Sequence, residues 1–231
     1  NQGNRDSLYK LALMYLTGEN VNEVNKELAV QYLKRSSKLC NYDAHAKYSQ
    51  CLLNGEGVPG VNEVKALKHA RISAENDNLV GMACYGSMLY YGRGCEPDVG
   101  AAKPFIVKAS DASIPEAMDI YGQMYINGQG VTEDAKKGAK LFEKASELGS
   151  VDATFHYAQC LEKGTGVDMN IKKSATYYKK AADCGHTISM YIYADFAEKG
   201  KGTSQSDKEA AKYYLQAANN GHVESMTCYA V

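Results

Sequence analysis

The chain repeats one short glycine motif at a nearly constant interval, and this regularity constrains its fold more than any other feature. Five copies of the motif read Gly-x-Gly, and the first copy reads Gly18-Glu19-Asn20. The copies begin 36 or 37 residues apart, at Gly18, Gly55, Gly92, Gly128, Gly164 and Gly200. A fixed period of this length is typical of solenoids, in which each repeat packs only on its neighbours. Such a scaffold offers a long surface, so we expect binding, and catalysis would need evidence of its own.

The residues before each glycine motif follow the pattern of one amphipathic helix, here called helix A. Its positions are numbered backwards from the first glycine, so that −11, −7, −4 and −3 share one helical face. Position −7 is Leu11, Tyr48, Tyr85, Tyr121, Tyr157 and Tyr193, and position −4 is Met14, Cys51, Met88, Met124, Cys160 and Phe196. Position −6 is always small, which predicts a closely approaching neighbouring helix. We expect these columns to form the core, with the tyrosine hydroxyls at its polar edge. The alternative for the tyrosines is a stacking platform for bases or sugars.

A second amphipathic pattern, here called helix B, follows each glycine motif. Its expected N-caps are Asn25, Asn62, Asp98, Asp134, Asn170 and either Ser206 or Asp207. Gly149, Gly185 and Gly221 are expected to end helix B, where the earlier repeats carry Cys40, Asp77 and Ser113 instead. Pro104 predicts a distortion of the third helix B, whereas Pro115 suits the first turn of the following helix A.

The combined pattern resembles the Sel1-like repeat, an α/α relative of the tetratricopeptide repeat. The clearest copies are residues 153–185 and 189–221, where helix B reads Lys-x-Ala or a close variant, then Tyr-Tyr-x-x-Ala-Ala-x-x-Gly. One departure is His69-Ala70, which stands where an aromatic pair is expected. The resemblance implies an all-α fold, a right-handed α/α superhelical solenoid of about six helix pairs plus the start of a seventh. We place the repeats at roughly 5–40, 41–77, 78–113, 114–149, 150–185 and 186–221, with a partial repeat at 222–231, in a single domain of residues 1–231.

Both ends of the chain fall inside this pattern. The first residues lie within a helix A, and Ser225, Tyr229 and Ala230 fit positions −11, −7 and −6 of a seventh repeat. We therefore expect a piece of a longer protein. The end repeats would lack a neighbour, and one alternative is that they form a homodimer.

The sequence gives little support for chemistry at a metal, a cofactor or a nucleophile. Its five histidines form no His-x-x-x-His, and its cysteines form no Cys-x-x-Cys, so we predict neither a metal nor a cofactor. His186 and His222 follow the glycines that end helix B, as loop residues or as a pH- or metal-sensitive ladder. Ser7-x-x-Lys10 matches one motif of penicillin-recognising enzymes, but the partner motifs Ser-Asp-Asn and Lys-Thr-Gly are missing. We predict that the protein is not an enzyme.

Composition limits the kinds of partner and the cellular compartment that we expect for this chain. The net charge of −1 is not strongly skewed between the halves, so no nucleic-acid partner is indicated. No apolar run approaches the length of a membrane span. The seven cysteines are odd in number and irregularly spaced, which opposes a complete disulfide framework, and Cys51 and Cys160 fall in the core column. Reduced thiols favour a cytoplasmic or nuclear compartment, with the secretory-pathway lumen as the alternative.

A partner-binding surface is expected on helix A, which normally lines the concave side of stacked α/α repeats. Positions −12, −9, −5 and −2 are predicted to point away from the core, and −9 and −5 differ from copy to copy. Such variation is typical of a tailored surface, or of unconstrained solvent positions. Phe155 and Tyr191 are candidate aromatic anchors, and the amides of Gln123 and Gln159 suit an extended peptide backbone. Tyr90 and Tyr91 either extend the groove or pack beneath the loop. The candidate residues are Gln50, Ser87, Tyr91, Asp119, Gln123, Phe155, Gln159, Tyr191 and Asp195.

Together these features predict a non-catalytic scaffold or adaptor that binds a peptide or partner protein in the concave helix A groove. One alternative is an enzyme-like or sugar-binding protein of the secreted Sel1-like type. The other is a self-assembling structural segment.

Overall fold

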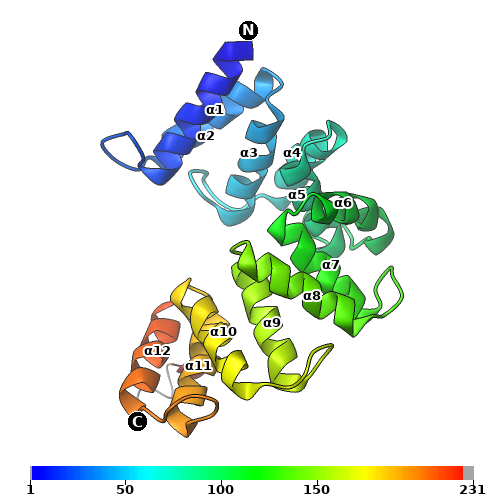
Figure 1. Ribbon diagram of the computed structural model, residues 1–231. Helices are drawn as coiled ribbons and strands as arrows, with labels where there is room; N and C mark the ends of the chain where they lie inside the picture. The colour runs from blue at the N-terminus through cyan, green and yellow to red at the C-terminus, as the bar shows by residue number, and fades with distance from the viewer. Residues whose placement is uncertain (1, 226–231) are drawn as a thin grey trace. The chain divides into compact units, whose positions relative to one another are not determined.

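The computed structural model describes the backbone of residues 2–225, and this part of the chain is built from α-helices joined by short turns and loops (Figure 1). The helices A are α1 (Gln2–Thr17), α3 (Tyr42–Asn54), α5 (Leu79–Tyr91), α7 (Pro115–Asn127), α9 (Val151–Lys163) and α11 (Thr187–Lys199). The helices B are α2 (Lys26–Lys38), α4 (Glu63–Glu75), α6 (Val99–Asp111), α8 (Ala135–Glu147), α10 (Ile171–Asp183) and α12 (Asp207–Asn219). Residues 223–225 begin a further helix. This confirms the predicted all-α fold of six helix pairs and the start of another. Tyr229 and Ala230 lie outside the described residues.

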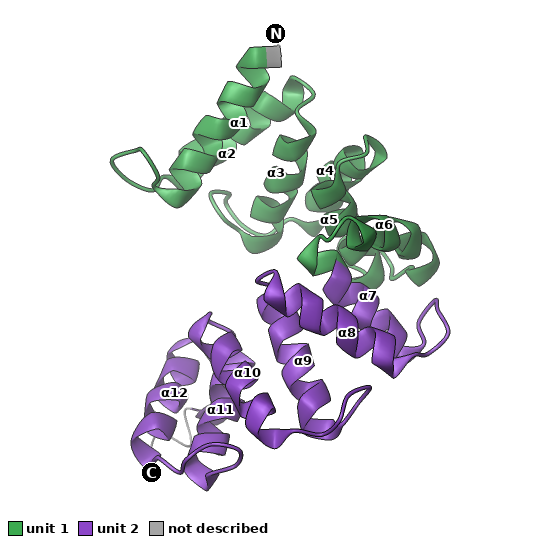
Figure 2. Ribbon diagram, viewed as in Figure 1, with its two compact units in different colours: residues 1–117 green, residues 118–231 purple. Residues whose placement is uncertain are grey.

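The helices group into two compact units (Figure 2). Unit 1 comprises Asn1–Ala117 and unit 2 comprises Met118–Val231, so that the division falls within α7. Each unit has its own buried apolar clusters. That the whole chain is one domain stays a prediction.

The predicted N-caps begin the helices B as expected. In each case a side-chain oxygen accepts a hydrogen bond from the backbone N–H three residues on, as Oδ1 of Asn25 does from Leu28. The capping residues are Asn25, Asn62, Asp98, Asp134, Asn170 and Ser206. Ser206, and not Asp207, caps the last of them, since Asp207 is already helical. These caps satisfy N–H groups that have no partner within the helix.

The turn that follows each helix B keeps one backbone conformation in repeats that differ in sequence. Gly149, Gly185 and Gly221 have φ of 96°, 94° and 86°, one residue beyond the C-cap, which confirms them as helix-ending glycines. In the first three repeats Cys40, Asp77 and Ser113 occupy the same left-handed region, with φ of 61°, 59° and 62°. A side chain with a Cβ is strained there, and all three residues are exposed.

The predicted core columns are buried in most repeats. Position −4 is buried in every copy but the first, and position −7 is buried in the second, fifth and sixth copies and partly exposed in the others. At position −4, Cys51, Met88 and Met124 are completely inaccessible to solvent. At position −7, Tyr157 is buried as expected, and its hydroxyl donates a hydrogen bond to Glu143 Oε1 at 2.7 Å. The small column at −6 lies against helix B, because a Cβ on Gly122 would come within 2.6 Å of the Phe142 ring. The prediction of a close helix approach is confirmed.

One expectation about the helices needs correction and another is untested. Pro104 lies inside α6, which runs unbroken over 13 residues like the other helices B, and the distortion expected there stays a prediction. Position −9 does not point away from the core, because Ala46, Ala83 and Asp119 are at most 5% exposed. A helix A packs on its own helix B and also on the next helix A. The contact with the next helix A covers position −9.

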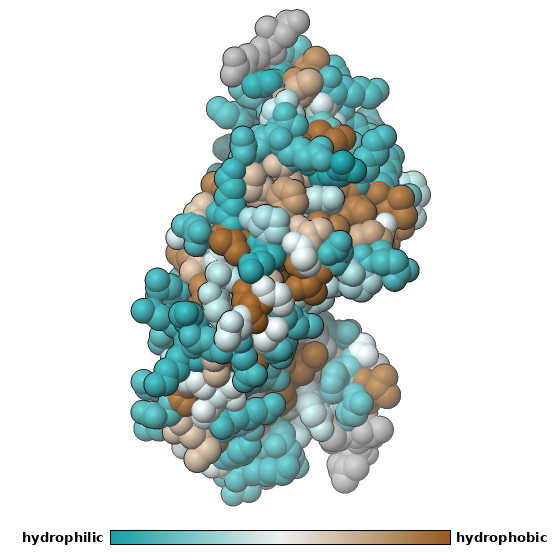
Figure 3. Space-filling view, turned by 90° about the vertical axis from the view of Figure 1, so that its right-hand side faces the viewer, coloured by the Kyte–Doolittle hydropathy of each residue, from teal (hydrophilic) through white to brown (hydrophobic). Residues whose placement is uncertain are grey.

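The accessible surface mixes side chains of both kinds. Figure 3 shows one face of the molecule, on which hydrophobic side chains lie interspersed among hydrophilic ones. Single exposed apolar side chains of this kind are normal for a protein surface. Among the described residues, none of the helices combines the length and the apolar character needed to cross a membrane.

Candidate partner-binding site

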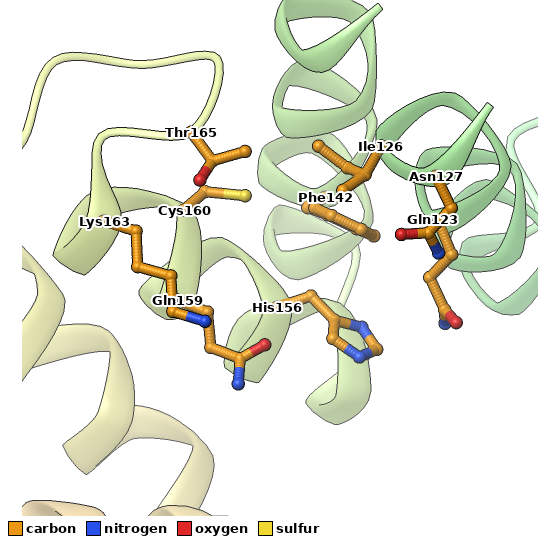
Figure 4. A pocket seen from close by; sticks show the side chains of 9 residues that line it. All are labelled: Gln123, Ile126, Asn127, Phe142, His156, Gln159, Cys160, Lys163 and Thr165. Carbon is orange, nitrogen blue, oxygen red and sulfur yellow. The ribbon is translucent and has the colours of Figure 1, made fainter. Parts of the chain in front are cut away.

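A pocket of about 260 Å³ opens on the helix A side of unit 2, between α7, α8 and α9 (Figure 4). Its lining residues are Gln123, Ile126, Asn127, Phe142, His156, Gln159, Cys160, Lys163 and Thr165. Figure 4 shows the α7 side chains on one side, those of α9 and the following loop on the other, and Phe142 of α8 between them. Two of the candidate residues from adjacent repeats, Gln123 and Gln159, therefore line one pocket.

A buried carboxylate holds two of the polar side chains in place. Asp119 is 5% exposed, and its Oδ1 accepts a hydrogen bond from Nδ1–H of His156 at 2.7 Å. Its Oδ2 accepts a second hydrogen bond from Nε2 of Gln123 at 2.9 Å. With Nδ1 carrying the shared proton, Nε2 of His156 is an acceptor in the neutral ring and a donor in the charged ring. Asp119 therefore lies beneath the surface and positions His156 and Gln123.

The bottom of the pocket is apolar. Phe142 is 3% exposed, and its ring centroid lies 5.1 Å from that of His156. Cys160 stands one helical turn after His156, which raises the question of a Cys/His nucleophile. Burial raises the pKa of the Cys160 thiol to about 11, so the thiol stays protonated at neutral pH. The pocket thus offers binding groups without an activated thiolate.

The polar part of the pocket is rich in hydrogen-bond donors. Gln123 and Asn127 belong to α7, Gln159 and Lys163 belong to α9, and Thr165 follows in the loop. None of the nine lining residues is acidic, whereas Lys163 is a cation and His156 is ionisable. These groups suit a polar or anionic ligand with apolar atoms next to its polar group.

The other candidate residues of unit 2 lie elsewhere. Phe155 and Tyr191 are partly buried and pack on the core, so the expectation that they are non-core aromatics was wrong. The Phe155 ring lies 4.6 Å from His186 between centroids, one repeat further along. Asp195 forms an i,i+4 ion pair with Lys199 on the surface of α11.

In unit 1 the candidate residues also have local partners. Nε2 of Gln50 contacts Sγ of Cys84 at 3.5 Å, and Ser87 is partly exposed. Tyr90 is buried, and Tyr91, which is 49% exposed, meets it edge-on at 4.9 Å between ring centroids. Tyr91 is therefore the one of the pair that extends the surface. That any of these residues binds a partner stays a prediction.

Seven of the nine lining residues were not among the candidates from the sequence: the polar His156, Lys163, Asn127 and Thr165, and also Ile126, Phe142 and Cys160. A signal for the first of them exists, because Asp119 and His156 are 37 residues apart, about one repeat period. Residues one period apart on successive helices A are neighbours in a stacked array. An acidic residue and a histidine at that separation therefore point to an inter-repeat pair.

The histidines that follow helix B lie in the turn before the next helix A, as the loop alternative predicted, and accept a hydrogen bond from its first turn. His186 is the N-cap of α11, and its Nδ1 accepts a hydrogen bond from the backbone N–H of Ser189 at 3.2 Å. His222 makes the same contact with Ser225 at 3.3 Å. Within the described residues, no three His, Cys, Asp or Glu side chains are grouped so as to hold a metal ion.

Comparison with known protein families shows the family to which this chain belongs. The model of the Sel1 repeat family matches residues 5–39, 43–78, 80–112, 115–150, 151–186 and 187–222, and the chain belongs to this family. No curated protein matches the chain. The fold is similar to that of a Sel1 repeat protein from Oxalobacter formigenes, with a TM-score of 0.76, 21% identity and coverage of 94% of this chain and 86% of that one.

Two further structures are similar. One is c5321, a protective antigen of uropathogenic Escherichia coli with an SLR fold, at a TM-score of 0.64, 24% identity and 99% coverage of this chain. The present chain spans about half, 49%, of that antigen. The other is the immunity protein Pa5087 of Pseudomonas aeruginosa, at a TM-score of 0.62, 18% identity and coverage of 93% and 81%. At these identities the similarity shows the fold alone.

Proposed function

We propose that this Sel1 repeat protein is a non-catalytic scaffold that binds a peptide or a partner protein on its helix A surface, at the pocket between α7 and α9. The observation that carries the proposal is the buried Asp119, which fixes His156 and Gln123 beside Gln159 at one open pocket. Side chains held in position lose little entropy when a ligand binds. The amide of Gln159 offers a donor and an acceptor, which match the groups of a peptide backbone.

The pattern along position −5 supports a surface with a binding role. This column is partly exposed in all the repeats, as Leu13, Gln50, Ser87, Gln123, Gln159 and Asp195. Position −5 is thus partly accessible in every repeat but carries a different side chain in most of them. Repeat proteins that bind extended partners have surfaces of this kind. The presence of immunity proteins among the similar structures supports a protein as the class of partner.

The proposal is tested by selecting peptide ligands from a random library displayed on phage against the immobilised chain. Each selected peptide is then measured against Gln123→Ala/Gln159→Ala. The matched control is Gln31→Ala/Gln216→Ala, which makes the same two changes on exposed positions of helices B. Helicity and thermal unfolding of both variants should equal those of the parent chain.

We expect the pocket variant to bind at least tenfold more weakly, which corresponds to about 1.4 kcal/mol, and the control to bind normally. Equal binding by both variants would place the site elsewhere on the scaffold. Failure to select any specific peptide would count against a peptide-binding function.

A further inference from the structure

We propose that the pocket between α7 and α9 binds the side-chain carboxylate of an aspartate or glutamate within a continuous segment of the partner. This inference rests on the proposed function and specifies the chemistry of the partner at the same site. It follows from the charges around the pocket, from its apolar bottom and from the placement of its amides.

The side chains that line the pocket favour an anion. Lys163 contributes a positive charge and His156 an ionisable ring, and none of the lining side chains is acidic. Asp119 lies beneath, and both of its oxygens already accept hydrogen bonds, from His156 and Gln123. A ligand carboxylate would therefore meet Lys163 as a donor, and His156 as a second donor when its ring is charged, without facing an unpaired acidic group.

The acidic residue next in sequence to Lys163 is engaged elsewhere. Glu162 Oε1 pairs with Nζ of Lys201 at 2.7 Å, and its Oε2 accepts a hydrogen bond from the Tyr178 hydroxyl at 2.8 Å. These contacts lower the pKa of Glu162 against the effect of its burial, so the carboxylate stays charged and paired. Lys163 itself is exposed on the last turn of α9, where its ammonium is available to a ligand.

The apolar bottom favours a side chain over a small inorganic anion. Ile126 and the buried ring of Phe142 provide a surface for the methylene groups that precede a carboxylate. A free phosphate or sulfate has no apolar atoms with which to use that surface.

The amide of Gln159 indicates that the partner continues beyond its acidic residue. Figure 4 shows Gln123 on the α7 side and Gln159 on the α9 side, with His156 between them. Gln123 already donates to Asp119, whereas the amide of Gln159 can pair with a peptide group of a chain that crosses the pocket.

The test uses pools of fluorescent octapeptides with one fixed central residue: Glu, Asp, Gln or Asn. The flanking positions are randomised without acidic residues, and both ends are blocked, so the fixed residue is the only source of a carboxylate. Affinities are measured by fluorescence anisotropy. We expect the Glu and Asp pools to bind at least tenfold more tightly than the Gln and Asn pools, and added salt to weaken this preference.

Three variants locate the preference on the structure. Lys163→Gln should reduce it to about twofold, because the pocket loses its permanent cation, which removes about 1 kcal/mol of charge-assisted binding. Lys163→Arg keeps the charge and should keep the preference. Lys173→Gln is the control, because it makes the same change in net charge on α10 and outside the pocket.

The outcomes separate this inference from the function on which it rests. Similar binding of all four pools would overturn the carboxylate site and leave the peptide-binding scaffold intact. An acidic preference that survives Lys163→Gln would show that Lys163 does not provide it and would also overturn the inference. Absence of binding by every pool would contradict the proposed function itself.

Discussion

His186 lies against the ring of Phe155, with 4.6 Å between the ring centroids, although the two residues belong to successive repeats. The same imidazole caps α11 by accepting the backbone N–H of Ser189. One repeat later the pair recurs, with Tyr191 and His222 at 4.7 Å. In these two repeats the aromatic ring at position −9 of one helix A thus packs on the histidine that precedes the next helix A. The stacking couples neighbouring repeats and leaves the cap partly buried.

This cap predicts that unit 2 is sensitive to acid. Burial is the main reason that the pKa of His186 lies below its ordinary value; His156 lowers it further, and Asp152 raises it. The unfolded chain then takes up the proton first as the pH falls below about 6.5, so stability is complete above that pH and declines below it. Protonation at Nδ1 would also remove the acceptor of the capping hydrogen bond.

The change His186→Asn should reduce this pH dependence. Asparagine already caps α3 and α5 in this chain, as Asn41 and Asn78, so the cap is retained without a titratable ring. Urea unfolding of the parent and variant across the pH range from about 7.5 to 5 measures the effect. Parallel curves for the two proteins would show that His186 does not contribute to the acid sensitivity.

A second pH-sensitive pair is buried in unit 1. Nε2–H of His45 faces the Ser37 carbonyl at 3.1 Å, which makes its Nδ1 the acceptor for Nδ1–H of His69 at 2.9 Å. Burial, with the positive charges of His45, Lys65 and Lys68, lowers the pKa of His69 to about 4. Its contribution to stability is complete above about pH 6.5 and is lost as the pH falls toward about 4.

The change His69→Phe tests this pair with the residue type of Phe105, which holds the corresponding place in the third repeat. At neutral pH we expect a loss of about 1 kcal/mol, because Nδ1 of His45 loses its donor. Between about pH 6.5 and 4 the unfolding free energy of the variant should fall less steeply than that of the parent chain. An unchanged slope in urea titrations would contradict the pKa shift of His69.

The turns after helix B predict a pair of opposite substitutions. Ser113→Gly should stabilise the chain by about 1 kcal/mol, because Ser113 has φ of 62° and is exposed. Gly149→Ser should destabilise it by a similar amount, at φ of 96° and with nothing within 4 Å of an added Cβ. Midpoints of urea unfolding measure both changes, and shifts in the same direction would refute this explanation.

The repeat period explains why so much of the fold follows from the sequence. Met88 and Met124 share one position of the period, and the geometry that buries one buries the other. The caps follow in the same way, since Asn25 and Asn170 occupy one place before helix B. The N-caps and the apolar positions recur with the same period, so the sequence predicts the helices and their pairing together.

The candidate site was only partly predictable for a physical reason. Gln123 and Gln159 share position −5, and their meeting at one pocket follows from the stacking of identical units. Asp119 and His156 occupy −9 and −8, so their contact depends on the stagger between successive helices A, which the period does not specify. Phe155 was assigned to the surface because the helical wheel describes one helix and omits the neighbour that covers it.

The two glycines of one motif should differ in how much they tolerate a side chain. Gly164 and Gly166 both have φ of 71°, so alanine is strained equally at either position. At Gly164 an added Cβ would meet Met169 Cβ at 3.4 Å, which is ordinary contact, whereas at Gly166 it would overlap the carbonyl of Ala135 in the preceding repeat. We therefore expect Gly164→Ala to cost about 1 kcal/mol and Gly166→Ala to cost about 2 kcal/mol more.

Urea unfolding of the two alanine variants measures the difference directly. The second glycine would then be the residue that lets one repeat dock on the next, while the first only ends helix A. Equal losses for the two variants would mean that backbone conformation alone explains the motif and that the docking contact adjusts without cost.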